Sequence, residues 1–207
     1  MKKIITLAAL AGLAATASAA NLFTDGSFES IVQAPGTWNT YTSVPGWTVS
    51  TAAFTPSANG LEIRNNVAGT AEDGSNFVEL DGYENDRITT GFATTIGQAY
   101  QVSFWYANRA GVAASSEGFD AAVLSGGVTS ASLVGNAASN GWLQEKIIFT
   151  AGSTYSVFTI AAAGASDGYG TSVDNFNAIA VPEPATLGLL AAGLAVIGLS
   201  SRRRRQH

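Results

Sequence analysis

Four carboxylates in the first half of the chain have a residue type and spacing that suit acid–base chemistry. They are Glu62, Glu79, Asp81 and Glu84. Glycoside hydrolysis needs two carboxyl groups that face each other about 5 to 9.5 Å apart, and side chains on neighbouring strands could meet this requirement. Solvated side chains beside a turn are the alternative, because nothing in the sequence sets these four apart from other surface carboxylates.

Other catalytic constellations are missing from the middle of the chain. The single histidine is His207, in the C-terminal tail, and the chain has no cysteine. A Ser-His-Asp triad, a Cys-His dyad and a histidine-rich zinc site are therefore excluded inside a folded domain. The glycines of residues 164–170 precede no predicted helix, so they match no phosphate-binding loop. These observations predict a protein that is not an enzyme.

Aromatic residues offer a different chemistry, the binding of sugar rings. A sugar site needs exposed aromatic faces beside hydrogen-bonding groups in a groove. Trp105 is the strongest candidate for contact with a glycan, because it lies on the opposite face of its predicted strand from the apolar Phe104. Trp47 and Trp142 adjoin turns, and we expect both to pack inside the fold. The full supply of candidate aromatics is Trp38, Tyr41, Trp47, Tyr83, Trp105, Trp142 and Tyr169.

The elements that must position these side chains are predicted to be short strands. Residues 100–106 form the clearest strand, with Tyr100, Val102, Phe104 and Tyr106 on one face by the two-residue period. Turn dipeptides such as Asp-Gly and Asn-Gly separate the strands, and no helical period is sustained. Similar central strands are predicted at 77–80, 142–149, 155–161 and 173–179, edge strands at 47–50, 61–64, 87–92 and 119–124, and loops or weak edge strands at 110–118 and 126–139.

About nine short strands predict one all-β domain between residues 21 and 180, a single β-sandwich of the jelly-roll type. A domain of about 160 residues can bury an adequate core by itself. The chain has no cysteine, so stability must come from burial or from a metal rather than from disulfides.

The predicted domain is strongly acidic. Between residues 21 and 181 there are fourteen Asp and Glu side chains and four Lys and Arg side chains, a net charge of −10. An acidic field repels nucleic acid and anionic lipid, and it favours divalent cations or neutral partners. We therefore expect no nucleic-acid partner. Solubility in an exposed setting is the simpler explanation of the charge.

The N-terminal 20 residues have the pattern of a secretory signal peptide. Lys2 and Lys3 form a basic region, residues 4–15 form an apolar helix, and residues 17–19 are the small residues that a signal peptidase accepts. The apolar stretch is short for a stable membrane anchor, which is the alternative. We expect residues 1–20 to be removed on export, with signal peptidase and the export machinery as partners.

A second apolar segment, residues 185–201, ends in Arg202, Arg203, Arg204 and Arg205. Sixteen or seventeen helical residues extend about 24 to 26 Å, and arginines that reach toward the interface can complete a span of the ~30 Å hydrocarbon core. The segment is therefore predicted to be a transmembrane helix in the inner membrane. Because the arginines favour the cytoplasmic side, the acidic domain should lie outside it.

The C-terminal pattern resembles a known sorting signal. Residues 181–186 read Val-Pro-Glu-Pro-Ala-Thr, with Pro182, Glu183 and Pro184 at the centre, and the apolar segment and arginine cluster follow at once. This arrangement resembles the PEP-CTERM signal over residues 181–207. The resemblance implies recognition by an exosortase in a Gram-negative bacterium that makes exopolysaccharide. The alternative is an ordinary proline-capped tail anchor.

Residues 21–180 resemble the galactose-binding-like jelly rolls that also occur among carbohydrate-binding modules. The segments that carry the resemblance are 21–29, 45–47, 73–81, 97–109 and 173–176.

The resemblance implies a structural calcium ion held between the first and last strands. Glu29 and Asp174 match the calcium-binding positions, and calcium prefers six to eight oxygen ligands. The alternatives are turn capping for Glu29 and a simple turn or bulge for Asp174. The resemblance also implies that Arg109 pairs with Glu79 or Asp81.

The sequence thus predicts an exported, exosortase-sorted, non-catalytic protein of the cell envelope or extracellular matrix, associated with exopolysaccharide. It should be anchored in the inner membrane during sorting and reach the cell surface or matrix afterwards. The alternative is a lectin or a carbohydrate-active enzyme with a defined glycan ligand.

Overall fold

The computed structural model describes residues 20–135 and 141–182, with side chains described outside 130–135. These residues form eleven strands and one turn of 3-10 helix, Ala114–Ser116, which confirms the all-β prediction. Within this part of the chain no helix is long and apolar enough to cross a membrane. The predicted signal helix, the transmembrane helix of residues 185–201 and Arg202 to Arg205 lie outside the described residues.

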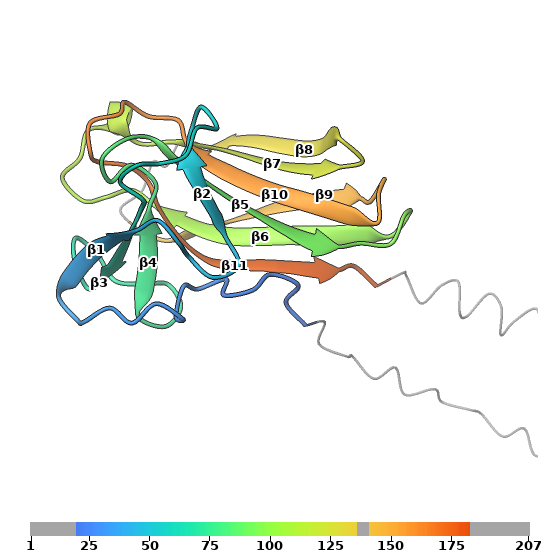
Figure 1. Ribbon diagram of the computed structural model, residues 1–207, viewed down its shortest axis with the longest axis horizontal. Helices are drawn as coiled ribbons and strands as arrows, with labels where there is room; N and C mark the ends of the chain where they lie inside the picture. Colours follow the sequence, from blue (N-terminus) through green and yellow to red (C-terminus); the bar gives the residue numbers. More distant parts are fainter. Residues whose placement is uncertain (1–19, 136–140, 183–207) are drawn as a thin grey trace, which may run out of the picture.

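Two antiparallel sheets stack face to face (Figure 1). The larger sheet has six strands in the order β1-β3-β4-β11-β6-β9. The bounds of its strands are Thr37–Tyr41 (β1), Leu61–Asn65 (β3), Asn76–Glu79 (β4), Ser172–Ala180 (β11), Ala99–Ala107 (β6) and Leu143–Thr150 (β9).

The smaller sheet has five strands in the order β2-β5-β10-β7-β8. The bounds of its strands are Thr48–Thr51 (β2), Asp86–Ala93 (β5), Tyr155–Ala162 (β10), Phe119–Ser125 (β7) and Val128–Gly135 (β8). Consecutive strands often lie in different sheets, so the chain crosses between the layers repeatedly, as it does in a β-sandwich.

The core fills the space between the sheets because apolar side chains alternate along the strands. In β6, Tyr100, Val102, Phe104 and Tyr106 all point inward and are buried, as predicted, while Trp105 lies on the outer face. Phe104 stacks on Phe176 of β11 with ring centroids 5.5 Å apart. Full burial of each such side chain contributes roughly 1.5 to 3 kcal/mol, so the aromatic core can hold the sandwich together without disulfides.

The first segment of the domain joins this core. Phe28 is fully buried, and Trp47 packs on Phe176 with centroids 5.0 Å apart, which confirms the expectation that Trp47 lies inside. Gly26 lies against β11, where a Cβ atom would sit 2.1 Å from the carbonyl oxygen of Phe176. Only glycine allows this approach, and the Gly26 carbonyl accepts the N–H of Phe176 at 2.9 Å.

Three predicted edge strands are interior strands. The strands at 61–64, 87–92 and 119–124 correspond to β3, β5 and β7, and each has neighbours on both sides. Their outer neighbours are β1, β2 and β8, which are short or polar. Of these, β1 was not predicted, and β8 falls in the stretch that was predicted to be a loop or a weak edge strand. Conversely, β9 was predicted as a central strand and lies at a sheet edge. A strand with one buried face can lie at the edge of a sheet or in its interior. The burial pattern of its side chains does not show whether it has one or two hydrogen-bonded neighbours.

The two ends of the domain lie at one end of the sandwich. The N–H of Leu22 donates to the carbonyl of Ala178, and the N–H of Val181 donates to the carbonyl of Ala99, the first residue of β6. The loops 94–98, 126–127 and 151–154 lie at this same end, and none of them contains a charged residue. We call it the sorting-signal end.

Candidate functional site

Trp105 lies in a shallow groove on the outer face of the six-stranded sheet. The groove has a volume of about 520 Å³ and crosses β9, β6 and β11. Trp105 is partly buried, so part of its ring remains open to the groove. The residues that line it are Gln101, Ser103 and Trp105 from β6, Gln144 from β9, and Asn175, Asn177 and Ile179 from β11.

The register of the sheet explains this lining. Trp105 is opposite Gln144 on one side and Asp174 on the other. The pairing of β11 with β6 shifts between Asp174 and Asn177, as at a β-bulge, and Asn175 adopts a left-handed conformation with φ 47°. The bulge lets Asn175 and Asn177 both line the groove.

The groove has the chemistry of a neutral sugar site. An aromatic ring can stack against the apolar face of a pyranose, and carboxamides both donate and accept hydrogen bonds with its hydroxyls. Of the described residues that line the groove, four carry carboxamides and none is charged. The arrangement therefore suits a neutral glycan better than a charged one.

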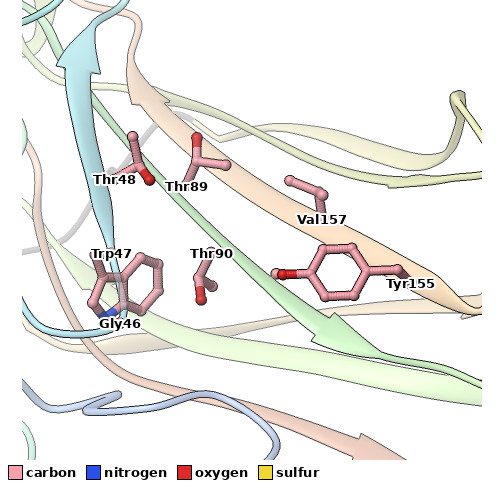
Figure 2. Close-up of a pocket in the computed structure, with 8 residues that line it drawn as sticks. Gly46, Trp47, Thr48, Thr89, Thr90, Tyr155 and Val157 are labelled. Atoms are coloured by element: carbon pink, nitrogen blue, oxygen red, sulfur yellow. The ribbon is translucent and has the colours of Figure 1, made fainter.

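A second hollow, of about 460 Å³, lies on the five-stranded sheet (Figure 2). Figure 2 shows the ring of Tyr155 lying across the hollow, with its hydroxyl directed toward Thr90. Tyr155 is exposed and lies over Gly91, where a Cβ atom would meet its hydroxyl at 2.3 Å. Trp47 at the other side is buried in the core. Threonine hydroxyls and one open ring make this a less complete sugar site than the Trp105 groove.

Two of the four candidate carboxylates lie together, but both are engaged in ion pairs. Glu62 and Glu79 are opposite each other on β3 and β4. Arg64 contacts both carboxylates, and its Nε lies 2.5 Å from Glu62 Oε1. Arg109 Nη1 donates to Glu79 Oε1 at 2.9 Å, which confirms the expected pairing of Arg109 with Glu79. Asp81 is fully buried and accepts a backbone N–H from the loop before β11. These contacts favour a structural role for the pair over acid–base catalysis.

Trp142 lies outside the core, so the expectation that it packs between the sheets was wrong. Its ring meets Phe77 at 6.0 Å on the outer face, and its Nε1 donates to the carbonyl of Thr70 at 3.0 Å. Phe77 itself is buried beneath this contact. The outer face of the six-stranded sheet is thus partly covered by aromatic packing, which turn position alone could not predict.

Glu29 and Asp174 are brought to the same loop, which precedes β4. Glu29 Oε1 accepts hydrogen bonds from the N–H groups of Ser75 and Asn76, at 2.8 and 2.7 Å. Asp174 Oδ2 accepts two more from this loop, at 2.8 and 3.0 Å. The two carboxylates therefore connect the first segment and the last strand through one loop.

The donor set around these carboxylates fits calcium only in part. Calcium needs six to eight oxygens, whereas N–H groups already contact Glu29 and Asp174. Among residues 20–135 and 141–182, no group of three or more acidic, histidine or cysteine side chains is placed to share a metal. Calcium at Glu29 and Asp174 stays a prediction.

Calcium is expected to raise the melting temperature by a few degrees relative to EDTA. A cation held by Glu29 and Asp174 would tie the first segment and the last strand together through one loop. Differential scanning calorimetry with calcium, magnesium or EDTA measures the shift. Superimposable curves would show that backbone N–H groups alone hold the loop.

The stability of the domain is expected to fall by roughly 2 kcal/mol or more between pH 4.5 and 7.5. Burial raises the pKa of Asp174 to about 7, with Asp73 adding to the rise, and burial raises the pKa of Asp86 to about 7, with acidic neighbours adding to it. Both values exceed that of an unfolded aspartate, about 3.9. The folded state therefore holds the protons more tightly, and the stabilisation, complete below about pH 4, is lost as pH rises through 7.

Urea unfolding in EDTA across this pH range measures the effect. The variant Asp86→Asn should show a shallower dependence, because its side chain cannot ionise. A free energy of unfolding that is constant or rises toward pH 7.5 in the unsubstituted chain would contradict the assignment.

The sequence placed Trp105 on the outer face of its strand but did not identify the residues that surround it. Gln101 and Ser103 share its face by the two-residue period, so this part of the groove was accessible to sequence reasoning. Asn175 and Asn177 enter the groove through the bulge of β11, which alternation does not reveal.

The two stacked antiparallel sheets place the domain among β-sandwiches of known structure. A Stig cyclase from Fischerella sp. TAU, solved with an indole ligand, has a TM-score of 0.62 at 17% identity, covering 81% of this chain and 100% of its own. The carbohydrate-binding module TmCBM61, solved with β-1,4-galactotriose, has a TM-score of 0.54 at 16% identity, covering 78% and 99%. An arabinose-bound GH51 α-L-arabinofuranosidase has a TM-score of 0.51 at 13% identity, covering 78% and 26%. At these identities the likeness shows the fold alone.

Residues 180–205 match the PEP-CTERM protein-sorting motif, which confirms the resemblance found in the sequence. The motif indicates an exported protein that is sorted at the membrane and processed by exosortase and the export machinery. No curated protein is significantly similar to the chain in sequence.

Proposed function

We propose that this chain is a non-catalytic glycan-binding protein of the cell envelope or extracellular matrix, delivered there by exosortase and associated with exopolysaccharide. Its domain is proposed to be a galactose-binding-like jelly roll. The observation that carries the proposal is the Trp105 groove, which is lined by one aromatic ring and four carboxamides on a domain that leads directly into a sorting motif.

A carbohydrate-active enzyme is the second candidate, because glycoside hydrolysis needs paired carboxylates and Glu62 and Glu79 form a pair. The ion pairs with Arg64 and Arg109 weigh against it. Both candidates bind glycans; they differ in whether the bound glycan is cleaved.

The fold also supports a specific orientation during sorting. Among the described residues, which end at 182, Val181 is the last with a hydrogen bond to the domain: its N–H donates to Ala99, and its carbonyl accepts from Gln98. Three residues separate it from Ala185, where the apolar segment begins, and an extended chain of this length reaches only about 14 Å. The sorting-signal end must therefore lie close to the membrane if that segment is inserted.

The composition of the sorting-signal end suits this position. Its loops lack charges, and it exposes Ile96 (63%) and Val128 (69%). The acidic side chains lie farther along the sandwich, so an anionic bilayer would not repel this end.

Probes at the sorting-signal end are expected to be quenched from the bilayer, and probes at the opposite end are not. The chain has no cysteine, so single-cysteine variants Ile96→Cys and Val128→Cys can be labelled selectively. Ala165→Cys, exposed in the loop before β11, is the matched control. The full chain is reconstituted in vesicles with a headgroup-attached quencher. Equal quenching at all three positions would contradict the proposed orientation.

A further inference from the structure

A separate hollow, of about 300 Å³, lies beside β1 and β3, away from the Trp105 groove. Three aromatic side chains surround it and are exposed by about half: Trp38 (47%), Tyr83 (58%) and Tyr169 (47%). They come from β1, from the loop after β4 and from the loop before β11. Among the described residues, this hollow and the Trp105 groove share no lining residue.

The floor of the hollow is a buried ionic network. Glu62 and Arg64 line it, and both are almost fully buried. Burial raises the pKa of Glu79 behind them, and the guanidinium groups of Arg64 and Arg109 oppose that rise. The side chain of Arg109 is 20% exposed, so it can donate into the hollow while Nη1 binds Glu79.

One part of the aromatic rim, Tyr169 and its loop, is held by neighbouring side chains before any ligand arrives. The guanidinium of Arg109 lies 4.6 Å from the ring centroid of Tyr169. Asp167 holds the same loop: its N–H donates to Asp81 at 2.9 Å, and its Oδ2 accepts from Ser116 at 2.7 Å. Side chains held in this way lose little entropy when a ligand binds.

The charges nearly balance, which defines the class of ligand. Of the residues that line the hollow, Glu62 and Asp167 balance Arg64 and Arg109, so neither a strongly anionic nor a strongly cationic ligand is favoured. Planar charged groups under exposed aromatic rings suit a pyranose. Its hydroxyls can accept hydrogen bonds from a guanidinium and donate them to a carboxylate. Its C–H face can stack on an aromatic ring.

We propose that this hollow is a second glycan-binding site, selective for a neutral pyranose unit and independent of the Trp105 groove. The inference rests on the proposed function in one respect, that the ligand is a polysaccharide. Two sites on one domain make binding to a polymer bivalent, so the apparent affinity for long chains exceeds that of either site alone.

The test compares variants of the full chain on immobilised neutral polysaccharides, namely galactan, glucan, mannan and xylan, and on their trisaccharides. Trp38→Ala with Tyr83→Ala removes the aromatic rim of the second site, Trp105→Ala alters the groove, and a third variant combines all three substitutions. Phe54→Ala, which removes an exposed ring that lines neither of the two sites, is the control, and thermal melting establishes that each variant is folded.

The expected result is that either site variant binds polymer about tenfold or more weakly than the unsubstituted chain, while the combined variant does not bind. Trp38→Phe with Tyr83→Phe should retain binding, because rings remain. If Trp105→Ala abolishes binding and loss of Trp38 and Tyr83 changes nothing, the second site is refuted and the proposed function stands. If the unsubstituted chain binds none of the polysaccharides or trisaccharides, both fail.

Discussion

Trp105→Ala is expected to weaken binding of a trisaccharide to the groove by about tenfold or more, while the melting temperature changes by only a few degrees. The ring is the one aromatic surface among the residues of the groove, and truncating such an anchor typically costs more than 1 kcal/mol of binding free energy. Trp105 points away from the core, so its loss opens no internal cavity. Isothermal titration with the best trisaccharide ligand measures the change.

Two further variants separate stacking from general disturbance of the surface. Trp105→Phe keeps an aromatic face and should retain most of the affinity. Phe54→Ala removes an exposed ring that lines neither hollow and should bind like the unsubstituted chain. Unchanged affinity in Trp105→Ala, or an equal loss in Phe54→Ala, would show that the groove is not where the trisaccharide binds.

Arg64→Met is expected to destabilise the domain by about 3 to 5 kcal/mol, because it leaves two carboxylates buried without their shared cation. Glu62 and Glu79 are almost fully buried, and Arg64 contacts both of them. Arg109 still contacts Glu79, so Glu62 loses the larger part of its compensation. Urea unfolding at pH 7.5 measures the difference in the free energy of unfolding.

The matched control is Lys146→Met, which removes an exposed cation from β9 and should change stability by no more than about 0.5 kcal/mol. Replacing the network with apolar residues, as in Arg64→Met with Glu62→Leu and Glu79→Leu, should recover much of the loss. A cost below about 1 kcal/mol for Arg64→Met alone would show that the network is not a stabilising centre.

The buried face of a strand could be predicted from the sequence, because the alternation of apolar residues within that strand indicates which face is turned inward. Strict alternation in residues 100–106 identified the inward face of β6 and left Trp105 outside. Sheet position could not be predicted in the same way, because it depends on residues far away in sequence. Thr37–Tyr41 is largely exposed and lacks alternation, so β1 was missed and β3 was taken for an edge.

The candidate site was predictable to the same extent. The pairing of Arg109 with Glu79 was anticipated, whereas the contact of Arg64 with both Glu62 and Glu79 depends on cross-strand register. Trp142 shows the limit of reasoning from turns, since its ring packs on Phe77 outside the core. The aromatic rim of the hollow beside β1 and β3 joins three separate segments, and only the folded chain brings them together.

The central claim is that the exported domain binds a neutral glycan without cleaving it. The most direct measurement applies the purified chain to an array of neutral and acidic polysaccharides, including bacterial exopolysaccharides, and analyses the eluted glycans for cleavage by mass spectrometry. The account predicts selective retention on at least one neutral polysaccharide, which is recovered intact. Failure of the folded chain to bind any glycan would contradict the account, as would recovery of shortened products.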